Sequence, residues 1–199
     1  MHETNTGLQE LVRTGAWTTE PMRAEWGADG ELLVEAREES DAWRETSYGF
    51  VHDSAHALLS PFGAREAVEV TFVLDYDQQF DQAGVMIRVD ESTWIKAGVE
   101  VSDGAAQVGA VVTHGVSDWS VAPVPEWMGR EVTVRASRDG GAVTIRARVD
   151  DEPWRLVRVA PLSPTADARA GLFCCAPTRA GLVVRFVAHR RGEVDAALH

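Results

Sequence analysis

With 199 residues, of which 45% are hydrophobic and 25% charged, the chain is long enough to bury one substantial core, and we expect a single domain over residues 1–199. The net charge of -12, with no cluster of basic residues among aromatic ones, argues against a nucleic acid or an anionic membrane as partner. Because no signal-peptide pattern and no apolar run of membrane-spanning length is present, we expect a cytoplasmic protein that takes a neutral or small ligand.

The first third of the chain gives few regular patterns. Residues 1–15 are expected to form a short helical or irregular arm, and residues 30–36 to form a strand after the Asp29-Gly30 turn. In the segment 41–62 periodicity fails, while aromatic residues, charges and two histidines crowd together. That mixture is typical of a structured loop near a site, or of a loop packed over a sheet edge.

Alternation of apolar and polar residues is strongest from Phe80 to Ser120, where it predicts two strands with one buried face. A two-residue turn at Asp103-Gly104 reverses the chain, and pairing Glu100 with Gln107 places a third strand beside them. We therefore expect three antiparallel strands that present one polar surface. Its residues are Gln82, Met86, Arg88, Trp94, Lys96, Glu100, Gln107, Gly109, Val111 and Thr113.

Further strands are predicted on both sides of this region. They show the same period of two and are separated by turn residues, as at Asp139-Gly140-Gly141. The predicted segments are 69–75, 130–138, 143–149, 154–160, 168–175 and 181–189. Because no segment offers a long run at helical spacing, we expect an all-β fold. For about a dozen strands, a two-sheet antiparallel sandwich is the economical architecture.

Cys174 and Cys175 are the two cysteines of the chain, and they are adjacent within a predicted strand. A strand sends adjacent side chains to opposite faces, so a disulfide between these two residues would be strained. We expect two reduced thiols, one of them packed inward, and no redox pair.

A series of short motifs runs from residue 43 to residue 120. They are Trp43-Arg44, Tyr48-Gly49-Phe50, Asp53, His56, Asp81-Gln82-Ala83-Gly84, Met86-Ile87-Arg88, Asp90, Trp94-Ile95-Lys96, Gly98-Val99-Glu100, Asp103-Gly104, Val111-Val112-Thr113 and Ser117-Asp118-Trp119-Ser120. In this order they resemble a family of unknown function, sometimes called regulation-of-enolase proteins. The resemblance covers nearly the whole chain, since 150–158 and 171–177 are similar to the family's later strands. It departs at Phe80, where the family more often has Tyr, so a hydroxyl is missing there.

The resemblance implies a concanavalin A-like jelly roll, with two curved antiparallel sheets, and implies that the polar surface is the concave one. Trp94 is expected beside Arg88 across the hairpin, as a cation–π pair or a flat platform for a sugar ring. Lys96, the only lysine of the chain, lies two pleats from Glu100 on the same face. The expected ligand-binding residues are Tyr48, Gln82, Met86, Arg88, Trp94, Gln107, Thr113, Asp118 and Trp119. The alternative is that such pairs only solvate an open sheet face.

Catalysis on this face would need acid and base groups. A glycosidase uses two carboxylates roughly 5–10 Å apart. Glu100 is one candidate, and the second would come from the sheet rim, as Asp81, Asp53 or Asp118. The Glu-x-Asp-x-x-Glu strand motif of laminarinase-type hydrolases of this fold is absent. In a lyase or isomerase, His56 or His114 would act as base while Lys96 steadies an oxyanion. The candidate catalytic residues are therefore Glu100, Lys96 and His56.

Metal and cofactor motifs are weak or missing. His52-Asp53-x-x-His56 has the spacing of a metal pair, but that pair needs a helix and a third ligand, and the segment is predicted as loop. No Gly-rich phosphate loop, Gly-x-Ser-x-Gly elbow or Cys-x-x-Cys pair is present. We expect no metal and no cofactor.

The sequence alone leaves three functions open. The favoured one is binding of a carbohydrate-like or other small polar ligand on the concave face. The second is a small enzyme that acts on a sugar-like or biosynthetic intermediate. The third is a structural or protein-binding role, which would place an apolar patch over this face instead of a pocket.

Overall fold

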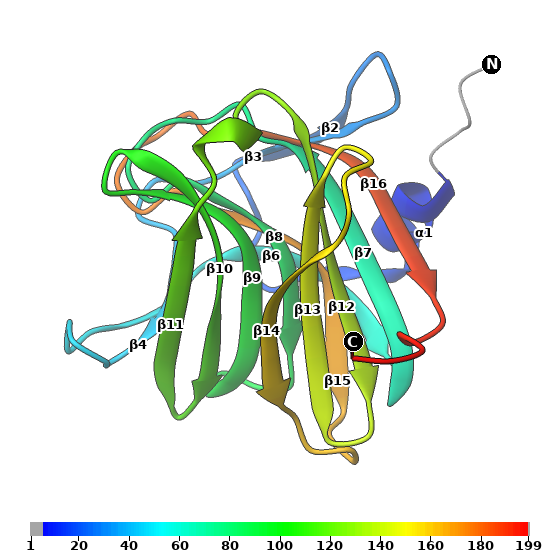
Figure 1. Cartoon of the computed structure of the whole chain (residues 1–199). Coiled ribbons are helices and arrows are strands. Elements are labelled where there is room, and N and C mark those ends of the chain that lie inside the picture. Colours follow the sequence, from blue (N-terminus) through cyan, green and yellow to red (C-terminus); the bar gives the residue numbers. More distant parts are fainter. Residues whose placement is uncertain (1–5, 199) are drawn as a thin grey trace.

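Two seven-stranded antiparallel sheets make up the body of the protein in a computed structural model, which describes residues 6–198 (Figure 1). Sheet A contains, in spatial order, β1 (Ala16–Trp17), β6 (His56–Phe62), β15 (Ala168–Cys175), β8 (Gln82–Arg88), β9 (Thr93–Ser102), β10 (Ala105–His114) and β11 (Val116–Pro123). Sheet B contains β14 (Arg155–Pro161), β13 (Ala142–Val149), β12 (Glu131–Asp139), β7 (Arg65–Val73), β16 (Val183–Gly192), β3 (Leu32–Glu35) and β2 (Arg23–Trp26). The predicted all-β antiparallel sandwich is confirmed.

Three smaller elements complete the fold. The helix α1 (Thr6–Thr14) lies against β16 and β6 and buries Leu8 and Leu11 (Figure 1). A short 3-10 helix, η1 (Pro125–Trp127), follows β11, and a separate two-stranded sheet pairs β4 (Ala42–Arg44) with β5 (Val51–Asp53). The predicted N-terminal arm contains α1, and its residues 1–5 lie outside the described residues.

The core between the sheets follows from the period-two alternation of the strands. On β9, Ile95, Ala97 and Val99 belong to the same buried cluster as Val132 and Val134 of β12. Burial of apolar surface contributes about 25 cal/mol per Å², so each inward position stabilises the packing of the two sheets. The opposite side of β9 is left to carry polar side chains.

The central hairpins have the predicted register. Glu100 pairs with Gln82 on one side and with Gln107 on the other. At the turn between β9 and β10, Asp103 and Gly104 have φ values of 53° and 77°. Two successive left-handed residues give the tight turn whose twist matches the flanking strands. The alternation therefore places the predicted polar side chains on one face of sheet A.

The segment 41–62 is not the continuous loop that we expected. It contains β4 and β5, and its last part, β6, is a strand of sheet A. The strand β6 was missed because apolar clusters cover both of its faces, so that Leu58 packs in the core while Ala57 and Leu59 pack on the outside. A strand buried on both faces shows no alternation of polar and apolar residues.

The two cysteines are free and buried, on opposite faces of β15. Cys174 belongs to the core, whereas Cys175 faces the outer side of sheet A. Burial raises the pKa of both thiols well above the ordinary value, so neither is a reactive thiolate. This confirms the predicted pair of reduced thiols.

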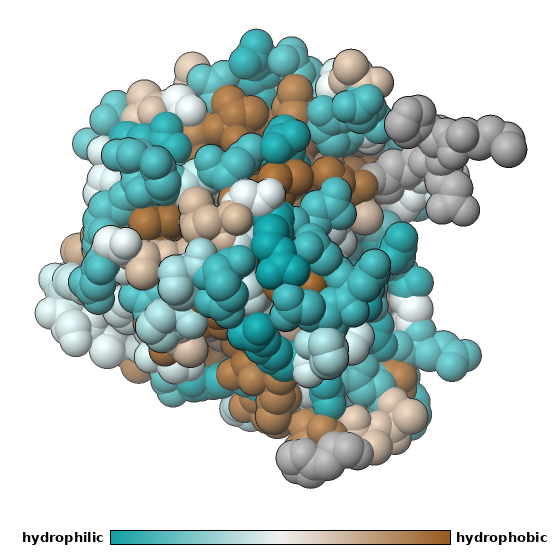
Figure 2. Space-filling model, turned by 45° about the horizontal axis from the view of Figure 1, so that its top comes forward, coloured by the Kyte–Doolittle hydropathy of each residue, from teal (hydrophilic) through white to brown (hydrophobic). Residues whose placement is uncertain are grey.

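The surface is mainly hydrophilic on the side drawn in Figure 2, where hydrophobic residues form separate small areas. In the described part of the chain, no helix has the length and hydrophobicity required to cross a bilayer.

Candidate functional site

A pocket of about 520 Å³ opens between sheet A and the β4–β5 hairpin, and we call it the hairpin pocket. Sheet A contributes Gln82, Lys96, Glu100, Val111 and Trp119 to its lining. The hairpin and the segment before it contribute Glu39, Asp41, Trp43, Tyr48, Phe50 and His52. Phe80, Pro177 and Thr178 close the remaining side. Figure 1 shows the β4 end of this hairpin projecting from the body of the protein beside β11.

The outer wall of the hairpin pocket is a chain of aromatic rings. Trp43 contacts Trp119 edge to face at 6.3 Å and Tyr48 at 5.5 Å between ring centroids. Phe50 stacks on Tyr48 at 5.3 Å and contacts His52 at 4.7 Å. Tyr48 and Phe50 are 55% and 40% exposed, whereas Trp43 is buried. The wall thus offers apolar ring surface to a ligand.

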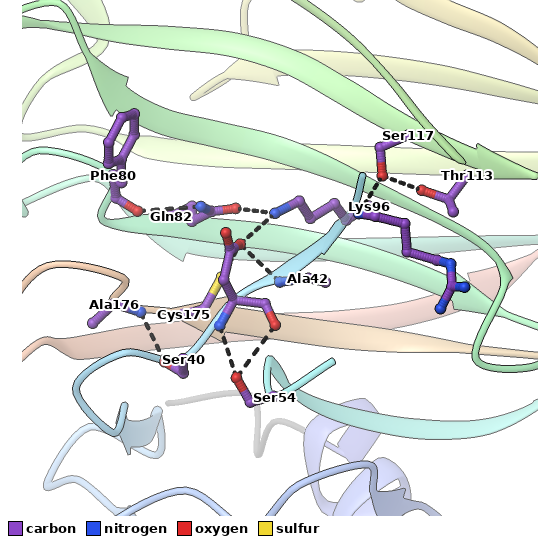
Figure 3. A network of polar contacts seen from close by, with 12 residues as sticks. Ser40, Ala42, Ser54, Phe80, Gln82, Lys96, Thr113, Ser117, Cys175 and Ala176 are labelled. Carbon is purple, nitrogen blue, oxygen red and sulfur yellow. Dashed lines mark hydrogen bonds and ion pairs between the residues drawn. The ribbon is translucent and has the colours of Figure 1, made fainter. Parts of the chain in front are cut away.

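The floor of the hairpin pocket carries a hydrogen-bonded ammonium group. Lys96 Nζ donates to Asp41 Oδ1 at 2.9 Å and to Gln82 Oε1 at 2.8 Å (Figure 3). The amide of Gln82 is oriented by its second contact, in which Nε2 donates to the carbonyl of Phe80. Burial has the largest single effect and lowers the pKa of Lys96, but the charge of Asp41, the smaller effects of Cys175 and Glu100, and the hydrogen bond to Asp41 together outweigh burial, so the pKa is raised. Lys96 therefore stays charged although it is only 4% exposed.

Glu100 lies four residues after Lys96, on the same face of β9. Within residues 6–198 its carboxyl group has no hydrogen-bond partner. Burial raises the pKa of Glu100 from 4.5 to about 7; the charge of Lys96 opposes this rise, and the charges of Asp41 and Asp103 add to it. A carboxyl group that changes charge near neutral pH inside a pocket is a candidate acid or base.

The raised pKa of Glu100 predicts a pH-dependent stability. Because the folded-state pKa lies above that of the unfolded chain, this group's contribution is fully present below about pH 4.5 and is lost as the pH rises to about 7. The free energy of unfolding of Glu100→Gln, measured relative to that of the unmodified protein, should therefore be larger at pH 8 than at pH 4.5, by at most about 3 kcal/mol. Urea unfolding of both proteins at several pH values measures the difference. A difference that stays constant with pH would contradict the prediction.

Between the levels of Lys96 and Glu100, sheet A carries glycine on three neighbouring strands. Gly84, Gly98 and Gly109 are paired across β8, β9 and β10. A Cβ at Gly98 would lie 1.9 Å from the carbonyl oxygen of Ala83, so no larger residue fits. The sheet surface is therefore bare between the ammonium and the carboxyl group, and Gly98 and Gly109 line a small hollow that continues the hairpin pocket along the sheet.

The β4–β5 hairpin is fastened to sheet A at both ends. The backbone N–H of Arg44 donates to Ser117 Oγ at 3.0 Å, and its guanidinium donates to the carbonyl of Gly115. Arg88 of β8 forms two hydrogen bonds, of 2.5 and 2.7 Å, with the carboxylate of Asp53. Together with the Lys96–Asp41 ion pair, these contacts hold the hairpin as a fixed cover over part of the sheet.

The structure brings five of the predicted site residues together in the hairpin pocket, namely Tyr48, Gln82, Lys96, Glu100 and Trp119. Gln107 lines only the adjoining hollow, where its amide donates to the carbonyl and hydroxyl oxygens of Ser102. Asp118 lies at the sheet edge, paired with Arg158.

Four predicted ligand-binding residues lie under the hairpin instead. Trp94 is 1% exposed, so the expectation of an open ring platform there is wrong. It packs in an outer cluster with Ala42, Trp43, Ala55, Ala57, Leu59, Met86, Val111, Phe173 and Cys175. Met86 is thus also buried, and Thr113 is buried with its hydroxyl bonded to Ser117. Arg88 directs its guanidinium at Asp53 and not into the pocket.

The predicted catalytic role of His56 does not fit its surroundings. His56 is fully buried, and its Nε2 accepts the backbone N–H of Arg37 at 3.0 Å. The proton must then sit on Nδ1, which lies 3.0 Å from the carbonyl oxygen of Thr19. Burial lowers the pKa of His56, in agreement with a neutral ring that ties two loops together. His114, the other candidate base, is exposed and contacts the carbonyl of Pro161.

The three rim carboxylates considered as partners of Glu100 are all paired with arginine. Asp53 binds Arg88, Asp118 binds Arg158, and the fully buried Asp81 binds Arg179. The carboxylates that accompany Glu100 in the pocket are Asp41 and Glu39. Within residues 6–198, no three His, Cys, Asp or Glu side chains are grouped as metal ligands.

Several pocket residues were absent from the predicted site. The crowding of aromatic residues in 41–62 signalled Trp43, Phe50 and His52 as a group, although it did not show which rings face a ligand. Asp41 had no signal, because its pairing with Lys96 joins residues 55 positions apart. Phe80 lines the pocket with φ at 65°, an uncommon backbone conformation for an aromatic residue.

Comparison with known proteins identifies relatives over most of the chain. Residues 17–193 match the family described as "Protein of unknown function (DUF1349)". Regulation of enolase protein 1 from Saccharomyces cerevisiae is 38% identical over 172 residues, which cover 86% of this chain and 86% of that protein. A crystal structure of a functionally unknown protein from Saccharomyces cerevisiae aligns with a TM-score of 0.84 at 37% identity, covering 92% of this chain and 97% of that one.

More distant structures share the fold. A xylan beta-1,4-xylosidase from Bacillus halodurans aligns with a TM-score of 0.64 at 15% identity, over 82% of this chain and 33% of that one. Lectin I-B4 from Griffonia simplicifolia aligns with a TM-score of 0.56 at 14% identity, over 90% of this chain and 93% of that one. These alignments confirm the predicted concanavalin A-like sandwich.

Proposed function

The chain belongs to the DUF1349 family of proteins of unknown function, and we propose that it binds a small polyhydroxylated, carbohydrate-like ligand in the hairpin pocket. The observation that carries the proposal is the pairing of an aromatic wall with a hydrogen-bonding floor in one cavity of about 520 Å³. A cavity of this size falls within the range of small-molecule sites.

The two sides of the hairpin pocket suit the two sides of a sugar. The rings of Tyr48, Phe50 and Trp119 offer apolar surface to the C–H face of a pyranose. On the floor, Lys96 uses two of its three N–H donors inside the protein and keeps one for a hydroxyl oxygen. Glu100, which has no hydrogen-bond partner among the described residues, can accept a hydroxyl hydrogen.

The fold neighbours add little to this proposal. One of them is named as a lectin and another as a xylosidase, but at 14% and 15% identity the similarity supports the fold and no particular function. The proposal therefore depends on the pocket and its side chains.

Loss of an exposed ring from the wall should weaken sugar binding without unfolding the protein. Phe50→Ala and Tyr48→Ala are each expected to raise Kd about tenfold, because a ring contact of about 1.4 kcal/mol is removed. Isothermal titration with a panel of monosaccharides and methyl glycosides measures the effect. Trp26→Ala is the matched control, since Trp26 is 44% exposed on β2 of sheet B and should leave Kd unchanged. The proposal fails if no sugar of the panel binds, or if the pocket variants bind like the control.

A second candidate function is acid–base catalysis on the same ligand, and the pKa of about 7 for Glu100 favours it. In that case Glu100→Gln should leave sugar binding measurable while turnover disappears. Nuclear magnetic resonance of bound sugars and glycosides over time gives the readout. If the unmodified protein releases every bound sugar unchanged, the catalytic candidate is rejected and binding alone remains.

A further inference from the structure

The charges that line the hairpin pocket do not cancel. Lys96 is neutralised by Asp41, whose Oδ1 lies 2.9 Å from Nζ. Glu39 and Glu100 also line the pocket, and in residues 6–198 neither side chain has a hydrogen bond or an ion pair with a basic group. Apart from His52, the described lining contains no further basic side chain. Ionised Glu39 and Glu100 therefore leave an excess of negative charge.

Two arginines near the pocket, Arg88 and Arg179, do not compensate for this excess. Arg88 is bound to Asp53 through two hydrogen bonds, and Arg179 is bound to the buried carboxylate of Asp81. Each guanidinium is matched by its own carboxylate. A ligand with a negative charge could reach the third N–H of Lys96, but there it would lie in the same pocket as the carboxylates of Asp41, Glu39 and Glu100, which repel it.

The aromatic wall adds to the attraction for a cation. The face of each ring is the negative part of its quadrupole, and rings grouped around a site bind ammonium groups. Tyr48, Phe50, Trp43 and Trp119 stand in continuous contact along the pocket. Glu100 is partly buried, so the charge of an ammonium bound beside it is screened less than at an open surface.

We propose that the ligand of the hairpin pocket carries an ammonium group, which lies between Glu39, Glu100 and the aromatic wall. The sugar-like part of the ligand rests on the proposed function, so together they describe an aminated, polyhydroxylated molecule. The preference for a cation depends only on the charges and rings of the pocket. It would hold for any small molecule that enters.

Two pairs of probes separate charge from shape. D-glucosamine is compared with D-glucose, and choline is compared with 3,3-dimethylbutan-1-ol, which replaces the charged nitrogen by carbon. Isothermal titration of the full chain should show each ammonium binding at least about 10-fold tighter than its neutral partner. The double variant Glu39→Gln/Glu100→Gln should reduce this ratio to less than about threefold. Glu91→Gln removes an exposed carboxylate in the turn between β8 and β9 and should leave the ratio unchanged.

The outcomes distinguish this inference from the proposed function. If glucose binds as well as glucosamine and choline shows no advantage, the inference is wrong and sugar binding stands. If D-gluconate binds most tightly, or no ammonium compound binds, the inference is likewise wrong. If choline exceeds its isostere while neither hexose binds, the inference holds and the sugar-binding function fails. A ratio that persists in the double variant would also overturn the role given to Glu39 and Glu100.

Discussion

Replacing Lys96 by methionine is expected to lower the free energy of unfolding by about 3–5 kcal/mol. Methionine keeps most of the length of the side chain but removes the ammonium. Asp41, whose side chain is 18% exposed, then loses its ion-pair partner, and Gln82 Oε1 loses its donor. An unpaired carboxylate in a partly buried site costs far more than a lost surface ion pair. Guanidinium unfolding followed by tryptophan fluorescence measures the change.

The same prediction specifies a rescue. Asp41→Asn in the Lys96→Met protein removes the stranded charge and should recover part of the lost stability, and the double-mutant cycle gives the coupling between the two residues. Arg65→Met is the control, because Arg65 and Asp139 form a pair with side chains 73% and 50% exposed. Its cost should stay below about 1 kcal/mol. The prediction fails if Lys96→Met costs no more than this control.

A structural role for Lys96 changes how its variants are interpreted. Asp41 begins the β4–β5 hairpin, and its backbone carbonyl also accepts the N–H groups of Ser54 and Ala55 at the end of that hairpin. Loss of the ion pair would therefore loosen the whole cover of the pocket. Reduced ligand binding in a Lys96 variant could then result from a displaced hairpin or from the loss of a direct contact with the ligand. Phe50→Ala is therefore the cleaner test of binding.

Strand direction and register could be predicted from the sequence because they follow from local rules. A period of two fixes which side chains share a face, and the turn at Asp103-Gly104 fixes the pairing of Glu100 with Gln107. Accessibility could not be predicted in the same way. Trp94 and Lys96 point to the predicted face, but what covers that face comes from residues 41–53, far away in the chain. Alternation within one strand contains no information about such a cover.

The same limit applies to the partners of charged residues. Arg88 was expected beside Trp94, and the two residues are cross-strand partners, yet the guanidinium binds Asp53 from the hairpin. A charged side chain follows the closest opposite charge, and that choice is made by tertiary structure. The segment 41–62 gave the one usable signal, since its aromatic residues were more numerous than a simple connection requires. They form most of the pocket wall.

Gly98→Ala is expected to abolish folding or to cost more than about 4 kcal/mol, although it adds a single methyl group. The new Cβ would lie 1.9 Å from the carbonyl oxygen of Ala83 and 2.8 Å from the Cα of Gly84. Both are backbone atoms of the neighbouring strand, so no flexible side chain can move aside. Separating the strands would break the pairing that positions Lys96 and Glu100 on the floor of the pocket.

The matched control for Gly98→Ala is Gly192→Ala, because Gly192 is likewise paired across a sheet, at the end of β16, but a Cβ added there would meet no atom within 4 Å. Soluble yield and thermal unfolding of the two variants should therefore differ sharply, with the control close to the unmodified protein. If Gly98→Ala melts within a few degrees of the control, the strands at this level can separate at little cost. The fold would then tolerate a side chain at the sheet surface between Lys96 and Glu100. Glycine at this position would have to be explained by the space that a ligand needs over the sheet.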